Sequence, residues 1–282
     1  MKKLFLLLVA AVMLPVVSAM ACTNFIVTKG ASADGSVIVS YSADSYGMYG
    51  FLAHYPAAVH HEGAMRDVYE WDTNKFLGQI PEAPVTYNVV GNMNEWQVTI
   101  GETTNGGREE CWGGEGIIDY GSLIYIALQR SKTAREAIDV MTSLVEQFGY
   151  VSEGETFSIA DPNEAWIMEM IGKGKAEKGA VWVAYRLPDG VICAHANQAR
   201  VRQFPLNDPA NCLYSKDVIT FAREKGWFDG KDEDFSFREA YNPLEFGAAR
   251  GCDARVWSAF NILGDGQFTY LDENGREVTK PA

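Results

Sequence analysis

Short runs of β-branched and aromatic residues alternate with turn residues over much of the chain. Cys22–Lys29 and Ser36–Ser42 are two such runs, and Asp34-Gly35 between them is a typical turn pair, so we expect two strands joined by a turn. Residues 56–82 carry scattered Pro, Gly and aromatic side chains and are expected to be irregular. The remaining expected strands are Val85–Gly91, Trp96–Glu102, Thr156–Ala160, Ala165–Ile171, Ala180–Arg186 and Val191–Ala196.

Apolar residues recur with helical spacing in a second set of segments. The strongest is Thr133–Phe148, where Thr133 and Glu136 form a capping box and Gly149 stands beyond the last turn. Further helices are expected at Ile118–Gln129, Val218–Lys225 and Phe246–Ile262. The order of strands, helices, strands and helices favours a layered α+β domain over alternating βαβ units.

The first 21 residues have the pattern of a secretory signal peptide. Lys2 and Lys3 precede an apolar stretch from Leu4 to Val17, and Ala19-Met20-Ala21 is an A-x-A cleavage site. We therefore predict a signal peptide at residues 1–21, one domain at residues 22–282, and export to the periplasm or the extracellular space. No later stretch has the length and apolarity of a membrane span, so none is expected in the mature chain.

Composition excludes some classes of protein and leaves others open. A hydrophobic fraction of 47% with 12% aromatic residues is typical of a packed core, and the formal net charge of −13 argues against nucleic acid as a partner. Five cysteines leave at least one thiol unpaired in an exported protein, and whether the others form disulfides stays open. His60-His61-Glu62 lacks a third spaced ligand, so neither a metal nor another cofactor is expected. The sequence does not indicate an oligomeric state.

Removal of residues 1–21 would make Cys22 the N-terminal residue. A thiol has a pKa of about 8.5 and an α-amine one of about 7.7–8.0, so an amine on the same Cα is a suitable base for the sulfur. Attack of the thiolate on an amide gives a tetrahedral oxyanion and then a thioester, without a histidine. The alternative is lipid attachment at Cys22, although a lipidation signal usually has Leu where this chain has Ala19.

The residues after Cys22 favour the catalytic interpretation. The segment from Cys22 to Ser36 resembles the start of mature bacterial dipeptidases of the N-terminal-nucleophile cysteine hydrolases, which are related to choloylglycine hydrolases and penicillin V acylases. Further matches follow in family order at Gly91–Glu95, Gly116–Tyr120, Ala134–Ala137, Trp166–Glu169, His195–Gln198 and Ala254–Trp257. The resemblance implies an αββα sandwich, in which two antiparallel sheets lie between helical layers.

The same resemblance implies roles for four residues. Cys22 supplies the nucleophile and the amine, Asp44 hydrogen-bonds that amine, Asn197 donates its side-chain amide to the oxyanion, and Arg255 is a site arginine. Each of the last three has a structural alternative: Asp44 as a turn cap, Asn197 as a strand-end residue, and Arg255 as an ion-pairing residue on a helix. Arg250 lies near enough in sequence to be the matching arginine instead.

The chain departs from the family pattern in two ways. Relatives commonly have Arg where this chain has Tyr41, so a cation beside the thiol is missing. They are also often much longer, so a C-terminal truncation is one interpretation. The aromatic residues Tyr46, Tyr49, Phe51, Tyr55 and Trp71 are expected to pack in the core rather than line a cleft.

The leading functional hypothesis is an exported dipeptidase. One alternative keeps the chemistry but takes N-acyl amides or bile-salt conjugates, and another is a lipid-anchored surface protein without activity. The amine of a dipeptide would need an anionic partner, and the sequence does not indicate which carboxylate provides it.

Overall fold

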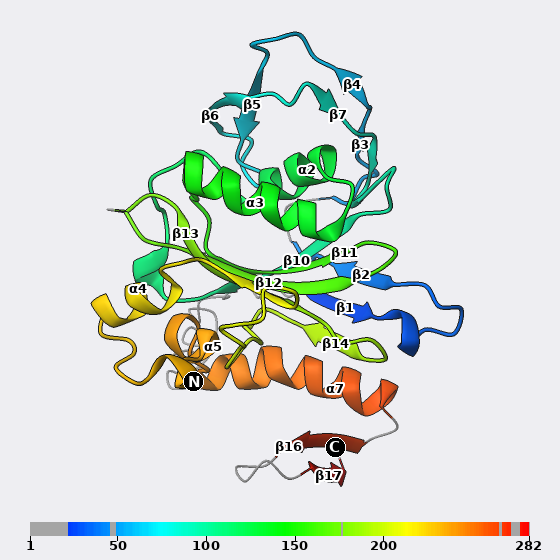
Figure 1. Ribbon diagram of the computed structural model, residues 1–282, viewed down its shortest axis with the longest axis vertical. Helices are drawn as coiled ribbons and strands as arrows, with labels where there is room; N and C mark the ends of the chain where they lie inside the picture. The colour runs from blue at the N-terminus through cyan, green and yellow to red at the C-terminus, as the bar shows by residue number, and fades with distance from the viewer. Residues whose placement is uncertain (1–21, 46–48, 176, 265–266, 272–276, 282) are drawn as a thin grey trace, which may run out of the picture.

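The computed structural model describes residues 22–45, 49–175, 177–264, 267–271 and 277–281; the predicted signal peptide and Tyr46 lie outside these ranges. Two helices, a large sheet, a small sheet and a further long helix follow one another as layers (Figure 1). All strand pairs in both sheets are antiparallel. The predicted α+β class is therefore confirmed.

The small sheet contains the first strand of the described chain. It consists of β1 (Thr23–Val27), β2 (Ile38–Ser42) and β14 (Ile192–His195), in the order β14-β1-β2. The predicted turn between the first two strands is present: the Asp34 carboxylate accepts the Ser36 N–H at 3.0 Å and Gly35 has φ +76°. Because β1 lies between its two partners, the residue that precedes it is held at the end of the sheet.

The large sheet has the order β15-β13-β12-β11-β10-β9-β8-β3. Every residue of β11 and β12 is buried, as expected for strands covered on both faces. The short strand β15 is absent from the sequence-based prediction, and the strand predicted at 96–102 instead begins at Thr99 and extends to Gly106. The strands of the large sheet are β3 (His54–Tyr55), β8 (Val89–Val90), β9 (Met93–Asn94), β10 (Thr99–Gly106), β11 (Gly154–Ala160), β12 (Ala165–Gly172), β13 (Ala180–Arg186) and β15 (Cys212–Tyr214).

Two predicted helices cover the outer face of the large sheet. They are α2 (Tyr120–Arg130) and α3 (Ala134–Phe148), and both start at a side-chain cap. Asp119 accepts the Ser122 N–H, and Thr133 accepts the Glu136 N–H at 3.1 Å. Their buried faces join Ile100, Phe157 and Trp166 of the sheet in the main hydrophobic core.

The opposite side of the molecule is covered by later segments. The helix predicted at 246–262 consists of α6 (Phe246–Ala248), a π-helical turn (Ala249–Asp253) and α7 (Ala254–Leu263). Val256 and Ala259 of α7 pack against Ala194 of β14, so α7 covers the small sheet. The remaining elements on this side are α4 (Val218–Glu224), α5 (Phe237–Tyr241), β16 (Gln267–Leu271) and β17 (Glu277–Pro281); short 3-10 turns occur at Lys29–Ala31, Glu109–Cys111 and Asp232–Asp234.

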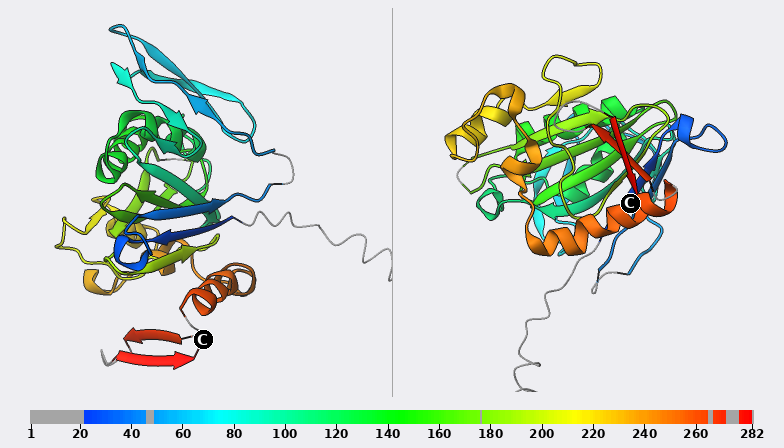
Figure 2. Two further views of the ribbon diagram at one scale, coloured as in Figure 1. Left: turned by 90° about the vertical axis from the view of Figure 1, so that its right-hand side faces the viewer. Right: turned by 90° about the horizontal axis from the view of Figure 1, so that it is seen from below.

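The prediction that residues 56–82 are irregular is wrong. They contain β4 (Ala58–Val59), β5 (Met65–Tyr69) and β6 (Phe76–Pro81), and β4 pairs with β7 (Val85–Thr86). These ribbons project beyond α2 (Figure 2). Each strand of the β5–β6 hairpin fully buries a single side chain, Val68 or Ile80, and a register shift follows Val68. A hairpin with so little buried surface shows no clear hydrophobic alternation in the sequence.

Polar groups cross the interface between the two sheets. The His195 ring on β14 contacts Thr103 Oγ1 at 2.8 Å and Ser158 Oγ at 2.7 Å, both on the large sheet. Ile26, Ala160 and Ala165 pack beside them in the same interface. Within the described ranges, no helix has the length and apolarity needed to cross a bilayer.

Candidate active site

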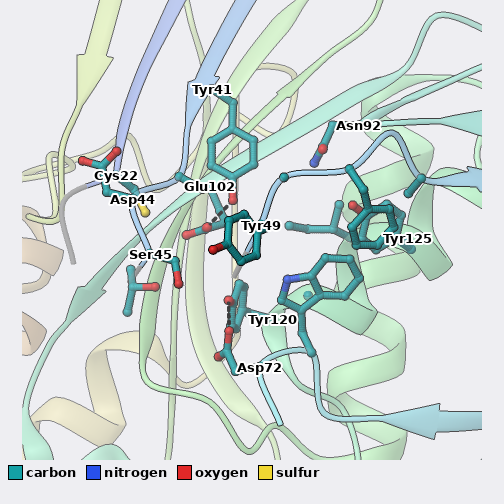
Figure 3. Close-up of a pocket in the computed structure, with 18 residues that line it drawn as sticks. Cys22, Tyr41, Asp44, Ser45, Tyr49, Asp72, Asn92, Glu102, Tyr120 and Tyr125 are labelled. Atoms are coloured by element: carbon teal, nitrogen blue, oxygen red, sulfur yellow. Dashed lines mark hydrogen bonds between the residues drawn. The ribbon is translucent and has the colours of Figure 1, made fainter. Parts of the chain in front are cut away.

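A cavity of about 210 Å³ opens beside Cys22, at the start of β1 (Figure 3). Its wall is built from the start of β1, the end of β2, the middle of β10, the N-terminal turn of α2 and the loop after β5. Carboxyl and phenol groups dominate the polar part of this wall, and aromatic rings form the rest. The lining includes Cys22, Tyr41, Asp44, Tyr49, Phe51, Trp71, Asp72, Glu102, Thr104, Tyr120 and Tyr125.

Cys22 is 3% exposed and lies at the cavity wall. Burial, followed by the negative charge of Glu102, raises the pKa of its thiol to about 11. The backbone N–H of Asp44 and the side chain of Asn197 hydrogen-bond the sulfur and act in the opposite direction. At neutral pH such a thiol is protonated, so it requires a base before it can attack a carbonyl.

None of the four histidines, all of which are described, contacts Cys22. His195 has both ring nitrogens bonded to hydroxyl groups across the sheet interface, and burial lowers its pKa to about 3. His60 contacts Thr86 Oγ1, whereas His61 contacts the main chain of Glu62. The adjacent histidines therefore have separate partners. A Cys–His pair is absent from this site.

Asn197 lies between Cys22 and the large sheet. Its Nδ2 donates to the Thr104 carbonyl at 2.6 Å, and its Oδ1 accepts from Arg255 Nη2 at 2.9 Å. The residue adopts φ +56°, an uncommon conformation that Asn tolerates better than most side chains. Both ends of the amide are therefore fixed, and its NH₂ group is held beside the sulfur.

Arg255, near the start of α7, connects the last helix to the first strand. Its Nη1 donates to the Cys22 carbonyl and to Thr23 Oγ1, and its Nη2 donates to the Ala196 carbonyl as well as to Asn197. Arg250 instead lies over the Phe246 ring, 5.6 Å from the centroid. Of the two candidate arginines, the structure brings Arg255 to Cys22.

Asp44 follows the end of β2 and has an exposed side chain. Its carboxylate accepts the Ser42 hydroxyl at 3.3 Å, and its negative charge raises the pKa of the Cys22 thiol. The four residues named from the sequence, Cys22, Asp44, Asn197 and Arg255, thus meet at one place although they come from distant parts of the chain.

Several polar residues of the site were missed by the sequence-based prediction. Glu102 in β10 accepts the Tyr41 hydroxyl at 2.6 Å, and Tyr120 donates to Asp72 at 3.0 Å (Figure 3). Glu155 in β11 is fully buried next to Glu102. Only Glu102 has a signal in the sequence, as a charged residue at the end of a predicted strand, and alternation does not tell which face of a strand is buried.

The aromatic residues are divided between two roles. Tyr55 packs on Tyr125 with ring centroids 4.9 Å apart, as expected. Tyr49 and Phe51 are 95% and 74% exposed and line the cavity together with Trp71, so the expectation of core packing is wrong for Tyr49 and Phe51. Side chains on a loop at a cavity mouth cannot be distinguished from core residues by type alone.

Comparison with known proteins identifies the family of the chain. Residues 48–279 match Peptidase family C69. The chain belongs to this peptidase family. Asn197 and Arg255 lie inside the matched segment of this C69 member, and Cys22 and Asp44 precede it.

Curated relatives carry related descriptions. The chain is 28% identical to a probable dipeptidase of Salmonella dublin over 84% of its own length, and 25% identical to a probable dipeptidase of Latilactobacillus sakei over 86%. A probable dipeptidase A of Streptococcus pyogenes serotype M3 is 28% identical over 84%. The alignments cover 57%, 53% and 53% of those proteins, so this C69 member spans little more than half their length.

Proposed function

We propose that this member of the C69 family is an exported cysteine dipeptidase whose nucleophile is Cys22. The observation that supports it best is the environment of the sulfur. The thiol is buried at a cavity wall, its pKa is raised to about 11, and no imidazole is in contact with it. The α-amine that signal-peptide removal would expose on the same Cα is the base that this site otherwise lacks.

The proposed reaction uses Cys22, Asp44 and Asn197. The amine takes the thiol proton, directly or through water, and the Asp44 carboxylate stabilises the resulting ammonium. The sulfur then attacks the carbonyl of the scissile bond, and the Asn197 amide donates to the oxyanion, a contribution that is typically worth about 3–4 kcal/mol. The ammonium returns its proton to the departing amine, which leaves a thioester, and water hydrolyses the thioester to restore Cys22.

The layered architecture supports the same interpretation. Two antiparallel sheets between helical layers are what the resemblance to N-terminal-nucleophile hydrolases implies. Here Cys22 directly precedes β1. Arg255 donates to the Cys22 carbonyl and so fixes the backbone that carries both amine and thiol.

The test begins with the protein expressed with residues 1–21 in place. Mass spectrometry of the exported product is expected to show a chain that starts at Cys22 with a free amine; a diacylglyceryl adduct would contradict the proposal. The product is then assayed on a panel of unblocked dipeptides. Cleavage of N-acyl amides without cleavage of dipeptides would favour the N-acyl amidase alternative.

Substitution of the nucleophile completes this test. Cys22→Ala is expected to abolish dipeptide cleavage, because it removes the only thiol of the described cavity lining, while the melting temperature changes little. Cys252→Ala is the matched control, since this half-buried thiol lies outside the cavity, and it is expected to keep full activity. Activity of the Cys22→Ala variant near the parent level would disprove the assignment.

A further inference from the structure

The cavity beside Cys22 has an unbalanced charge. Asp44, Asp72 and Glu102 line it, and its described lining contains no Lys, Arg or His. Asp44 is assigned above to the amine of Cys22, which leaves Asp72 and Glu102 as the other carboxylates of the wall. The Tyr120 hydroxyl donates to Asp72 Oδ1 and fixes that carboxylate at the N-terminal turn of α2.

Glu102 is a buried acid without a cation. It is 2% exposed, it lines the cavity, and Tyr41 donates to its Oε1. Its Oε2 has no donor in hydrogen-bonding geometry among the described residues, and the same is true of both carboxyl oxygens of Glu155. A buried acceptor without a donor, and above all a buried charge, is costly unless a ligand or a proton satisfies it.

A single proton shared by Glu102 and Glu155 does not remove the negative charge of this buried pair. Burial and the charge of Glu102 raise the pKa of Glu155 well above its usual value, so Glu155 holds a proton that it can donate to Glu102. Burial also raises the pKa of Glu102, whereas hydrogen bonds from Glu155 and Tyr41 lower it, so the two carboxyl groups share a proton, and the described cavity lining supplies no cation to balance the remaining charge. A cationic group of the ligand can therefore pair with the Glu102 carboxylate.

The position of Glu102 relative to the sulfur narrows the choice of cation. Cys22 and Glu102 line the same cavity, Figure 3 shows the Glu102 carboxylate beside Cys22, and the Glu102 charge raises the pKa of the Cys22 thiol. In an unblocked peptide, the α-ammonium is attached to the carbon next to the carbonyl that the sulfur attacks. A carboxylate beside the sulfur is therefore a suitable partner for this ammonium when the carbonyl is at the sulfur.

We propose that Glu102, together with Asp72, binds the free α-ammonium of the first residue of the substrate and so restricts the site to unblocked peptides. This inference rests on the proposed dipeptidase function. It assigns the anionic partner of the substrate amine to residues that the family resemblance did not name. Tyr41 and Tyr120 hold the two carboxylates and are positioning residues.

The test compares two substrates that differ only in the ammonium. One is alanyl-alanine, and the other is propionyl-alanine, in which hydrogen replaces the amino group. The parent enzyme is expected to prefer alanyl-alanine by at least a hundredfold in kcat/KM. Glu102→Gln is expected to lose at least tenfold on alanyl-alanine, mainly through KM, and to lose nothing on propionyl-alanine. Glu102→Asp is expected to restore part of the preference.

A second pair of variants covers the case in which Glu102→Gln does not fold. Asp72→Asn changes an exposed carboxylate of the cavity and is expected to reduce the preference severalfold. Asp67→Asn changes a carboxylate of the β5–β6 hairpin outside this cavity and is expected to leave it unchanged. Melting curves identify the folded variants. In folded Glu102→Gln protein, alkylation of Cys22 at pH 8 is expected to be faster, because a charge that raises the thiol pKa is gone.

The outcomes separate the two proposals. If the parent cleaves alanyl-alanine but Glu102→Gln and Asp72→Asn keep the full preference for the ammonium, the inference is wrong and the dipeptidase assignment stands. If the parent cleaves only blocked or acylated substrates, the proposed function itself is wrong. Should Glu102→Gln be unfolded, an unchanged preference in Asp72→Asn overturns the inference.

Discussion

At the scale of single residues, the candidate site combines a thiol that is held neutral with an amide and a guanidinium that are held rigidly. Burial and nearby carboxylates oppose ionisation of the Cys22 thiol, whereas the Asp44 N–H and the Asn197 amide favour it. The balance leaves a protonated sulfur that depends on a local base. An exposed cysteine with an ordinary pKa would react with other thiols and oxidants more readily than this one.

The guanidinium of Arg255 offers a test at this scale. Arg255→Lys keeps the charge but cannot donate to Cys22, Thr23, Ala196 and Asn197 at once. We expect kcat to fall by about ten- to a hundredfold, on the order of 1.4–2.7 kcal/mol in the barrier, with a smaller change in KM. Arg250→Lys, measured in parallel by steady-state kinetics, is the control and should retain activity. Equal kinetics for both variants would show that the Arg255 contacts do not support catalysis.

The sequence indicates some of these residues and not others. Cys22 stands out because a cleavage site precedes it, and Asn197 and Arg255 because they belong to short ordered motifs. Glu102 and Glu155 carry no such mark. Their chemistry depends on burial at the same place in adjacent strands, where Thr104 rather than Glu102 is the direct partner of Glu155. That relation arises only when β10 and β11 pair in their actual register.

At the scale of elements, the success of prediction follows the strength of local signals. α3 has a cap, a helical apolar face and a terminating Gly149, and the structure confirms it within one residue at its start. β15 and α5, of three and five residues, were not predicted. Such short elements owe their conformation to the surfaces they pack on, as β15 does on β13. Propensity over so few residues gives too weak a signal.

The contact of β14 with β10 and β11 predicts how the stability of the fold depends on pH. Burial lowers the pKa of His195 from 6.5 to about 3, so the folded state resists a proton that the unfolded state binds. Stability should therefore decrease as the pH falls below 6.5, by about 2 kcal/mol between pH 7 and pH 5 from this residue. Urea unfolding of the parent and of His195→Gln at pH 7 and pH 5 measures this loss of stability. Because the glutamine does not titrate, the variant should lack this part of the loss.

Buried carboxyls with raised pKa values, including Glu169 at about 7, act in the opposite direction. The difference between the parent and His195→Gln, rather than the parent alone, is therefore the relevant quantity. An identical pH dependence in both proteins would show that His195 accepts a proton in the folded state.

At the scale of the whole molecule, the charge of the surface and that of the cavity have the same sign. The formal net charge is −13, and the cavity wall adds carboxylates without a cation in its described part. A field of this sign attracts a substrate through its positive end and repels polyanions. The chain spans little more than half the length of the curated relatives it matches, so these properties belong to the region that they share with it.

The cysteines give a prediction for the molecule as a whole. All five are free thiols: Cys22, Cys111, Cys193, Cys212 and Cys252. Titration of the unfolded protein with a thiol reagent, without reductant, is expected to find all five, and dithiothreitol should leave the melting temperature unchanged. Fewer titratable thiols, or a lower melting temperature under reduction, would reveal a disulfide.

The bond from Arg255 to the main chain of Cys22 joins residues that are 233 positions apart. During synthesis, the first strand emerges long before α7 exists. A ribosome-bound or prematurely ended chain therefore holds its sulfur without the guanidinium clamp and without a fixed Asn197 amide. The proposed catalytic centre can therefore be completed only after α7 has been synthesised.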